Sequence, residues 1–331
     1  RRLPMAVGPV RTGIDVLEAS GFAPLVGKRV GLVTNHSGFD AQGRRTIDVL
    51  SQAPGVRLNA IFAPEHGIGT DLDARFGDTI DPRSNLVVHS LYGNSKAIPR
   101  SALADLDALV FDLQDAGVRS FTYLATLGAT LEAAAKAHIP VLVLDRPNPL
   151  GGDLVGGPVS DTADRSLTNY VPLPLLHGMT IGELARLLNG ELHIGAALHV
   201  VAMEQYDRAM RFADTGLGWV PPSPNLRDLS ALERYPDVGL VEGARVSVGR
   251  GTTAPFGMVG APWMDGAALA RELNALDTGA IYTPVHFVPA EGPYHGRSCS
   301  GVAIQRVSAL TRPGRIGLAL ARVLSQRYPE Q

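Results

Sequence analysis

The sequence contains a single cysteine, Cys299, and only three lysines among its 331 residues. One cysteine excludes an intramolecular disulfide and a zinc site built from cysteines. Thirty basic residues face 32 acidic ones, giving a net charge of −2, and no basic run stands out. We therefore expect no nucleic-acid partner, because such binding depends on a concentration of positive charge.

The sequence also lacks long apolar runs and the usual loops that bind nucleotide phosphates. No stretch of 18 uncharged apolar residues occurs, so we expect no membrane-spanning segment. Neither GxGxxG after the first predicted strand nor GxxxxGK[ST] is present. His36, His66 and His177 show neither the HxxxH nor the HExxH spacing of a helical metal site. We expect a protein that uses neither a metal nor an organic cofactor.

Glycine and proline are abundant instead, with 37 and 24 residues. Together they exceed the roughly 12% of average usage by about half. A hydrophobic share of 45% and a charged share of 19% exclude simple disorder. The length suits about two domains. These numbers predict a globular protein with many loops of defined shape.

Short β-branched runs alternate with helix-like segments in the first two thirds of the chain. The clearest helix pattern is Tyr123–Ala137, whose leucines and alanines suit one buried stripe. Thr180 and Glu183 have the spacing of a capping box for a helix over Thr180–Leu188. Apolar strands separated by helices predict an α/β fold with a Rossmann-like, mostly parallel sheet. The predicted strands are Arg29–Thr34, Leu58–Phe62, Leu86–Ser90, Ala108–Leu113, Val141–Asp145 and Leu198–Met203.

The pattern changes after the Pro-Pro-Ser-Pro stretch at 221–224. We predict a Rossmann-like domain over residues 1–225 and a second, smaller α/β domain over residues 226–331. In the smaller domain the predicted strands are Val238–Val248, Met258–Pro262, Val285–Pro289 and Gly301–Val307, and the predicted helices are Asp265–Asn274 and Arg315–Arg327.

Polar or Gly/Pro-rich clusters follow five strands of the predicted sheet. In open parallel sheets, ligands bind beyond the carboxyl ends of the strands. Five such clusters in succession therefore predict a binding site at this edge. The clusters are Thr34–Gly38, Ala63–Gly67, Ser90–Gly93, Asp112–Arg119 and Asp145–Gly152.

Glu65 is the first candidate for a catalytic residue. It follows an apolar strand and stands between Pro64 and His66-Gly67, where a stiff backbone could fix its direction. A carboxyl group partly desolvated in a cleft has a raised pKa and can act as a general acid. Taken alone, the pattern favours the other interpretation, a loop carboxylate that caps backbone amides.

Other polar residues also allow both functional and structural interpretations. Asp112 could face the site or satisfy loop amides, and Arg119 lies four residues before Tyr123, the spacing of one helix face. In the smaller domain, Arg250 between two glycines and Glu242 could bind a ligand or form an interdomain ion pair.

Eight motifs, in this order, give the chain a resemblance that covers nearly its whole length. On these motifs it resembles the exo-β-N-acetylmuramidase family (NamZ type) of bacterial peptidoglycan recycling. The motifs are VTNHSG (33–38), FAPEHG (62–67), SLYG (90–93), VFDLQDAGVRSFTY (110–123), LDRPNPLGG (144–152), HGMTIGEL (177–184), WVPPSPN (219–225) and VSVGRGTTAPF (246–256).

The resemblance implies a catalytic domain of Rossmann-like type and an auxiliary domain that closes a cleft. It implies a glycoside hydrolase that releases N-acetylmuramic acid from the non-reducing end of peptidoglycan-derived muropeptides or muramic-acid glycosides. Glu65 matches the family's proposed catalytic glutamate. Arg146 or Arg250 is a candidate bidentate partner for the lactyl carboxylate of muramic acid. The candidate substrate-binding residues are Asn35, His66, Gln114, Asp115, Arg119, Arg146, Asn148 and Arg250.

Such a reaction needs a second group, acting either as a nucleophile or as the base that activates water. The candidates are Asp78, Asp112, Asp115 and Glu242. Family members usually read Asp-x-Asp-Ala-Gly-Glu soon after PEHG, whereas residues 71–78 here are two residues longer and end in Asp78. The transfer of that glutamate's role to Asp78 is therefore open.

The main alternative is a non-catalytic protein that binds peptidoglycan fragments, and a weaker one is a cofactor-dependent enzyme on a Rossmann-like sheet. The single cysteine suits the cytosol and the bacterial periplasm equally. The chain starts Arg-Arg-Leu-Pro, which a removed leader or an arbitrary start would explain. We expect a bacterial protein of the periplasm or the cell exterior.

Overall fold

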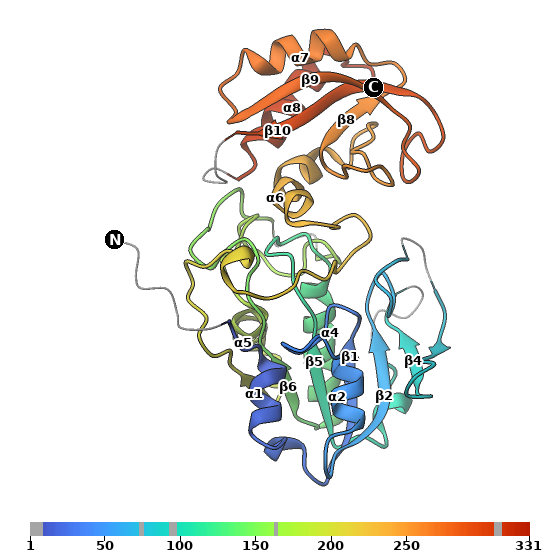
Figure 1. Ribbon diagram of the computed structural model, residues 1–331, viewed down its shortest axis with the longest axis vertical. Helices are drawn as coiled ribbons and strands as arrows, with labels where there is room; N and C mark the ends of the chain where they lie inside the picture. Colours follow the sequence, from blue (N-terminus) through green and yellow to red (C-terminus); the bar gives the residue numbers. More distant parts are fainter. Residues whose placement is uncertain (1–8, 73–75, 93–97, 162–164, 308–312) are drawn as a thin grey trace. The chain divides into compact units, whose positions relative to one another are not determined.

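The computed structural model describes residues 9–72, 76–92, 98–161, 165–307 and 313–331 (Figure 1). The chain divides into two compact units, each with its own sheet and helices. The first unit comprises Arg1–Val155 and Val159–Pro224, and the second comprises Gly156–Pro158 and Asn225–Gln331.

The first unit is built on a seven-stranded sheet in the order β3-β4-β2-β1-β5-β6-β7. All neighbouring strands are parallel except β3, which is antiparallel to β4 at one edge. Without β3, the order along the chain is the 3-2-1-4-5-6 order of a Rossmann sheet, confirming the predicted mostly parallel α/β fold. The strands are β1 Arg29–Thr34, β2 Arg57–Ala63, β3 Thr79–Ile80, β4 Val87–Ser90, β5 Ala108–Asp112, β6 Val141–Leu144 and β7 Leu198–Val201.

Helices cover both faces of this sheet, as continuous apolar strands require. Helices α1 and α2 pack with Val30, Leu32 and Val110 in one core cluster, and lie in front of the sheet in Figure 1. Helices α4 and α5 contact one another and cover the other face. The helices are α1 Gly13–Ala19, α2 Thr46–Ser51, α3 Arg100–Leu103, α4 Tyr123–Ala137 and α5 Ile181–Glu191.

Local sequence signals explain how several of these elements begin and end. Strand β1 and helix α4 have the predicted bounds. Helix α5 starts with the predicted capping box, in which Thr180 Oγ1 accepts from the Glu183 N–H and Glu183 accepts from the Thr180 N–H. Helix α4 ends at Ala137 and is capped by His138, whose φ of 56° is left-handed.

The second unit holds a three-stranded antiparallel sheet in the order β8-β10-β9. Asp265 caps helix α7 by accepting from the Ala268 N–H at 3.0 Å. The predicted second α/β unit is thus present, and its strand β10 and helices α7 and α8 match the predicted segments closely. The elements are α6 Leu229–Val238, β8 Met258–Ala261, α7 Gly266–Asn274, β9 Ala280–Phe287, β10 Cys299–Arg306 and α8 Arg315–Arg327.

The predicted strand Val238–Val248 is wrong. Val238 ends helix α6, and a short 3₁₀ turn, Gly239–Val241, follows it. Asp228 starts α6 by accepting from the Ala231 N–H, a capping signal that the prediction missed. Buried valines belong to a helix end, a turn and a loop here, because an apolar run alone does not separate a strand from other buried segments.

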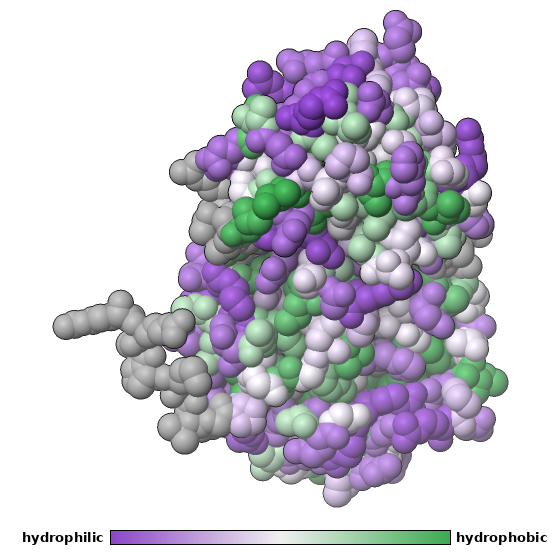
Figure 2. All heavy atoms as spheres, turned by 45° about the horizontal axis from the view of Figure 1, so that its top comes forward, coloured by the Kyte–Doolittle hydropathy of each residue, from purple (hydrophilic) through white to green (hydrophobic). Residues whose placement is uncertain are grey.

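Polar and apolar residues are mixed on the face shown in Figure 2, where apolar side chains form small separate patches. In the part of the chain that the structure describes, none of the helices is both long and apolar enough to cross a membrane.

Candidate active site

The candidate site lies at the carboxyl ends of β1, β2, β5 and β6 in the first unit. The sheet order reverses between β1 and β5, because β2 and β4 lie on one side and β6 and β7 on the other. Ligands of open α/β sheets bind at this switch point. Four of the five polar clusters singled out in the sequence follow these strands, at residues 34–38, 63–67, 112–119 and 145–152.

Glu65 follows β2 on a tightly turned loop. The Gly67 N–H donates to the Pro64 carbonyl at 3.1 Å, and both His66 and Gly67 have positive φ angles of 75° and 72°. The Glu65 side chain is half-buried. Among the described residues, none forms a hydrogen bond or an ion pair with its carboxylate. The amide-capping interpretation of Glu65 therefore finds no support, and its carboxyl group remains available for a reaction.

His66 supports the same loop. Its Nδ1 lies 2.9 Å from the carbonyl oxygen of Leu72, and its backbone carbonyl accepts from the Leu72 N–H at 3.3 Å. The imidazole is buried, with 7% of the residue exposed. His66 thus connects the Glu65 turn to the start of the 71–78 segment. Residues 73–75 of that segment lie outside the described part of the chain.

Tyr123, the first residue of α4, lies at the centre of the site and is fully buried. Its hydroxyl donates to the Pro222 carbonyl at 2.5 Å and accepts from Asn35 Nδ2 at 2.6 Å. The same oxygen lies 3.4 Å from the backbone oxygen of Glu65. Burial, together with the nearby Glu65 and Asp115 carboxylates, raises the pKa of Tyr123 far above its usual range. Tyr123 is therefore a fixed hydroxyl that joins the Pro222 and Asn35 loops by hydrogen bonds and lies beside the Glu65 loop.

Asn35 and Gln114 fix the loops after β1 and β5. Asn35 Oδ1 accepts from the Ser37 hydroxyl at 2.6 Å, and the Ser37 hydroxyl oxygen accepts from the Gln114 N–H at 3.1 Å. Gln114 Nε2 donates to the carbonyls of Asp115 and Pro147, both at 2.9 Å. Both predicted residues lie at this edge, with their side-chain amides engaged by the protein.

Asp112 and Arg146 form a buried ion pair between the ends of β5 and β6. Arg146 Nε lies 2.5 Å from Oδ1, and Arg146 Nη2 lies 2.9 Å from Oδ2. Asp112 also accepts from the Thr46 hydroxyl, and Arg146 also donates to the Phe39 carbonyl. With 0% and 2% exposure, neither side chain faces solvent. This geometry supports the structural interpretation of Asp112 and leaves Arg146 committed within the protein.

The loop after β6 is held by two buried polar residues. Asn148 Nδ2 donates to the Met179 carbonyl, and Asn148 Oδ1 accepts from the Leu150 N–H, both at 3.0 Å. Asp145 accepts from the Gly182 N–H at 2.8 Å and from the Thr180 hydroxyl at 3.0 Å. Burial raises the pKa of Asp145 to about 6 despite these hydrogen bonds. Asp145 thus ties β6 to the start of α5.

Two predicted residues take part in contacts around the site. Asp78 is exposed before β3, where it accepts from the Ser90 N–H at 2.9 Å and pairs with His89, contacts that lower its pKa. Arg119 lies before α4 and Nη1 donates to the Leu173 carbonyl at 2.7 Å, while burial lowers its pKa. The predicted helix face shared by Arg119 and Tyr123 is therefore wrong, since the helix begins only at Tyr123.

In the second unit, Arg250 Nε forms an ion pair with Glu242. Gly249 and Gly251 on either side have φ angles of 79° and 69°, as a tight turn between two glycines requires. The guanidinium lies 5.3 Å above the Phe256 ring, and the side chain keeps 21% exposure. Both residues thus belong to one unit and their pairing is internal to it. Their part in closing a cleft stays a prediction.

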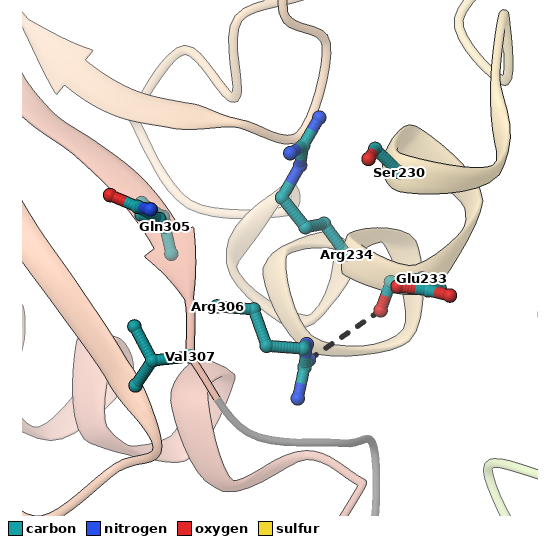
Figure 3. A pocket seen from close by; sticks show the side chains of 7 residues that line it. Ser230, Glu233, Arg234, Gln305, Arg306 and Val307 are labelled. Atoms are coloured by element: carbon teal, nitrogen blue, oxygen red, sulfur yellow. Dashed lines mark hydrogen bonds between the residues drawn. The ribbon is translucent and has the colours of Figure 1, made fainter.

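A cavity of about 530 Å³ in the second unit is not a convincing alternative site (Figure 3). Arg234 and Arg306 line it but point in different directions. Arg306 is bound to Asp237 and lies 3.5 Å from the Glu233 carbonyl. The two guanidiniums therefore do not converge on one ligand.

Three buried residues of the site are not among the predicted catalytic or substrate-binding residues: Tyr123, Ser37 and His177. The sequence indicates Tyr123 only through its spacing from Arg119, and His177 only as one of three histidines without the spacing of a metal site. All three lie inside the motifs VFDLQDAGVRSFTY, VTNHSG and HGMTIGEL, and that position is the signal in the sequence that points to them. In the part of the chain that the structure describes, no group of three His, Cys, Asp or Glu residues could hold a metal ion.

Comparison with known proteins finds relatives that match both units of the chain. The model "Exo-beta-N-acetylmuramidase NamZ, N-terminal" matches residues 30–230, and the corresponding C-terminal model matches residues 234–331. The peptidoglycan beta-N-acetylmuramidase NamZ of Bacillus subtilis (strain 168) is 40% identical over 329 residues, covering 97% of this chain and 78% of that protein.

Two crystal structures of DUF1343 family proteins from Bacteroides fragilis NCTC 9343 share the fold. One is 38% identical, with a TM-score of 0.88 over 97% of this chain and 84% of that chain. The other is 31% identical, with a TM-score of 0.74 over 91% of this chain and 78% of that chain.

Proposed function

Because this chain belongs to the exo-β-N-acetylmuramidase NamZ family, it is a glycosidase, and we propose that it releases N-acetylmuramic acid from peptidoglycan fragments with Glu65 as general acid. Its substrates are muropeptides or muramic-acid glycosides with muramic acid at the non-reducing end. An enzyme with this activity takes part in the recycling of cell-wall material.

The observation that carries the role of Glu65 is the contrast among the acidic residues. Asp112 is paired with Arg146, and Asp145 holds backbone and hydroxyl donors. Glu65 stands on a rigid turn beside them, and none of the described residues binds its carboxylate. A general acid must reach the glycosidic oxygen and lose its proton as positive charge develops on the sugar. Among these three acidic side chains, Glu65 is the one whose carboxyl group is not occupied by the fold.

Tyr123 supports this role because it is a rigidly held side chain against which the loop carrying Glu65 lies. Its hydroxyl is anchored to Pro222 and Asn35 and lies close to the Glu65 backbone oxygen. A fixed backbone limits the directions that the Glu65 side chain can take, which is how positioning contributes to rate. The second group of the reaction stays among the predicted Asp78, Asp115 and Glu242, with Asp112 disfavoured by its ion pair.

The lactyl carboxylate of muramic acid calls for a cationic partner. Arg146 is disfavoured, because Asp112 and the Phe39 carbonyl already engage its guanidinium. Arg250 keeps the predicted role. Its replacement by alanine should weaken cleavage of muramic-acid glycosides while having little effect on the matching glycosides that carry a lactyl amide in place of the carboxylate. Equal losses on both substrates would contradict the role of Arg250 as the partner of the lactyl carboxylate.

Product analysis tests the proposed reaction directly. The purified chain is incubated with the disaccharide N-acetylmuramic acid–N-acetylglucosamine and with its isomer carrying glucosamine at the non-reducing end. We expect free N-acetylmuramic acid from the first and no cleavage of the second. Saturable binding of the first disaccharide without release of free sugar would instead establish the non-catalytic alternative.

A further inference from the structure

Asp115, in the segment that follows β5, forms a buried pair with His177. They are 3% and 4% exposed. An isolated antiparallel bridge between Val118 and Leu176, and a hydrogen bond from the Arg119 N–H to the Leu175 carbonyl, hold their two segments side by side. The pair therefore results from backbone contacts that fix its geometry.

The hydrogen bonds of the imidazole determine where its proton lies. The Met179 N–H donates to His177 Nδ1 at 3.2 Å, so Nδ1 is the unprotonated nitrogen of the neutral ring. The ring proton is then on Nε2, which lies 3.5 Å from Asp115 Oδ2. Nε2 is buried, and none of the described residues accepts its proton in a hydrogen bond.

The Asp115 carboxylate has an acceptor atom without a donor, whereas His177 has a donor atom without an acceptor. Oδ2 accepts from the Gly117 N–H at 2.6 Å, whereas Oδ1 is buried without a donor among the described residues. The neighbouring amides do not supply one, because Gln114 and Asn148 donate to backbone carbonyls. A buried polar atom without a partner is costly and calls for an explanation.

The two unpartnered atoms are one acceptor and one donor, which is the complement of a single hydroxyl group. Nε2 lies 3.5 Å from Oδ2 of the same carboxylate, and a hydroxyl group that reached the pair would donate to Oδ1 and accept from Nε2. The pair also lies at the binding edge of the sheet, and the Asp115 charge acts on the same Tyr123 hydroxyl as the Glu65 charge.

We propose that Asp115 and His177 together bind the free 4-hydroxyl of the terminal muramic-acid residue. This inference rests on the proposed function. In a 1,4-linked glycan, only the sugar at the non-reducing end carries a free 4-hydroxyl. A site that hydrogen-bonds this group through buried partners discriminates against a sugar that lacks it, because the partners are then left unpaired. The pair would thus explain why cleavage is restricted to the chain end.

The test compares an aryl glycoside of N-acetylmuramic acid with its 4-deoxy analogue, which has the same leaving group. For the unmodified chain, loss of the hydroxyl should lower kcat/KM by about 10- to 100-fold, the range of a hydrogen bond to a charged group. Asp115→Ser and Asp115→Asn should lower kcat/KM on the hydroxyl-bearing substrate similarly. In these variants the 4-deoxy penalty should shrink to a fewfold.

His177 provides a second, independent arm. His177→Leu should reduce the 4-deoxy penalty and raise KM more than it lowers kcat, whereas His177→Gln, which keeps a donor, should recover part of the penalty. The control is His199→Leu, since His199 is exposed on β7 and should leave the penalty unchanged. Thermal unfolding identifies any variant that fails to fold, and affinity for free N-acetylmuramic acid against its 4-deoxy form repeats the comparison without catalysis.

Three outcomes distinguish a failure of the 4-hydroxyl inference from a failure of the proposed function. A 4-deoxy penalty that persists in folded Asp115 and His177 variants would overturn the inference and leave the proposed function intact, with a bound water as the partner of the pair. An unmodified chain that cleaves both glycosides equally well would do the same. A chain that cleaves neither glycoside would overturn the proposed function and this inference with it.

Discussion

Arg146 binds both carboxylate oxygens of Asp112 through Nε and Nη2, at 2.5 and 2.9 Å. The pair is buried at the junction of the ends of β5 and β6, next to the candidate site. A carboxylate held in this way stabilises the sheet edge and is not free to act as a base. This relationship separates residues that build the site from residues that can react in it.

Loss of Asp112 should therefore lower stability more than it changes chemistry. Asp112→Ala leaves the Arg146 charge buried without its partner, and we expect the free energy of unfolding to fall by about 3–5 kcal/mol. Chemical denaturation measures this change. The double variant Asp112→Leu/Arg146→Met should recover most of the loss, because it removes both buried charges together.

The control for this prediction is Asp105→Ala, which removes an exposed contact 3.7 Å from Arg29. We expect a change below about 1 kcal/mol. An Asp112→Ala variant with unchanged stability and abolished hydrolysis would return Asp112 to the catalytic candidates.

Tyr123→Phe should impair turnover in addition to stability. Removal of the hydroxyl takes a donor from Pro222 and an acceptor from Asn35, which we expect to cost about 1–3 kcal/mol. Because the same hydroxyl lies beside the Glu65 backbone, its loss should let the neighbouring loops shift and kcat should fall by about tenfold or more. Steady-state kinetics and denaturation are measured on the same preparation.

Tyr282→Phe is the matched control. Tyr282 is buried in the second unit, and its hydroxyl donates to Thr278 at 2.8 Å. Its loss should destabilise the protein by a comparable amount while kcat stays near that of the unmodified chain. If both variants lowered kcat equally, the effect of Tyr123 would be one of general stability and not of positioning.

The stability of the protein should depend on pH through Asp145. Burial raises the pKa of this group from 3.8 to about 6 in the folded state. Between these values the folded state binds the proton more tightly than the unfolded chain, so the Asp145 contribution to stability decreases as pH rises from about 4 to 6 and is constant above that range. The total decrease is on the order of 3 kcal/mol.

Asp145→Asn isolates this contribution. The amide oxygen can still accept from the Gly182 N–H, and the amide nitrogen can donate to the Thr180 hydroxyl oxygen. The difference in unfolding free energy between the variant and the unmodified chain should therefore move in favour of the variant as pH rises from 4 to 7. A difference that does not vary with pH would contradict the assignment.

Local signals in the sequence were sufficient to predict much of the fold. Strand Arg29–Thr34 contains the apolar run Val30–Val33, and Thr180 with Glu183 is a capping box whose partners are three residues apart. Such signals do not depend on distant residues. Val238–Val248 failed because its buried valines depend on tertiary packing around a helix end and a turn, which an apolar pattern does not encode.

The location of the candidate site could be predicted from the sequence, but the hydrogen-bond and ion-pair partners of its residues could not. The carboxyl ends of the strands were identified from their polar clusters, and parallel strands bring those ends together. The partners of Asp112 and Tyr123 were not predictable, because Arg146 and Pro222 lie 34 and 99 residues away in the chain. The folded sheet edge pairs the Asp112 carboxylate with Arg146 and leaves the Glu65 carboxylate without a partner among the described residues.

The dependence on the leaving group tests the central claim, Glu65 as general acid, most directly. The assay compares the unmodified chain with Glu65→Gln and with the exposed control Glu191→Gln. The two substrates are the disaccharide N-acetylmuramic acid–N-acetylglucosamine and the dinitrophenyl glycoside of N-acetylmuramic acid. A sugar leaving group needs protonation, whereas dinitrophenolate departs without it. We predict that Glu65→Gln loses about 10²- to 10⁴-fold in kcat/KM on the disaccharide and less than about tenfold on the dinitrophenyl glycoside. Near-normal hydrolysis of the disaccharide, or equal losses on both substrates, would contradict the claim.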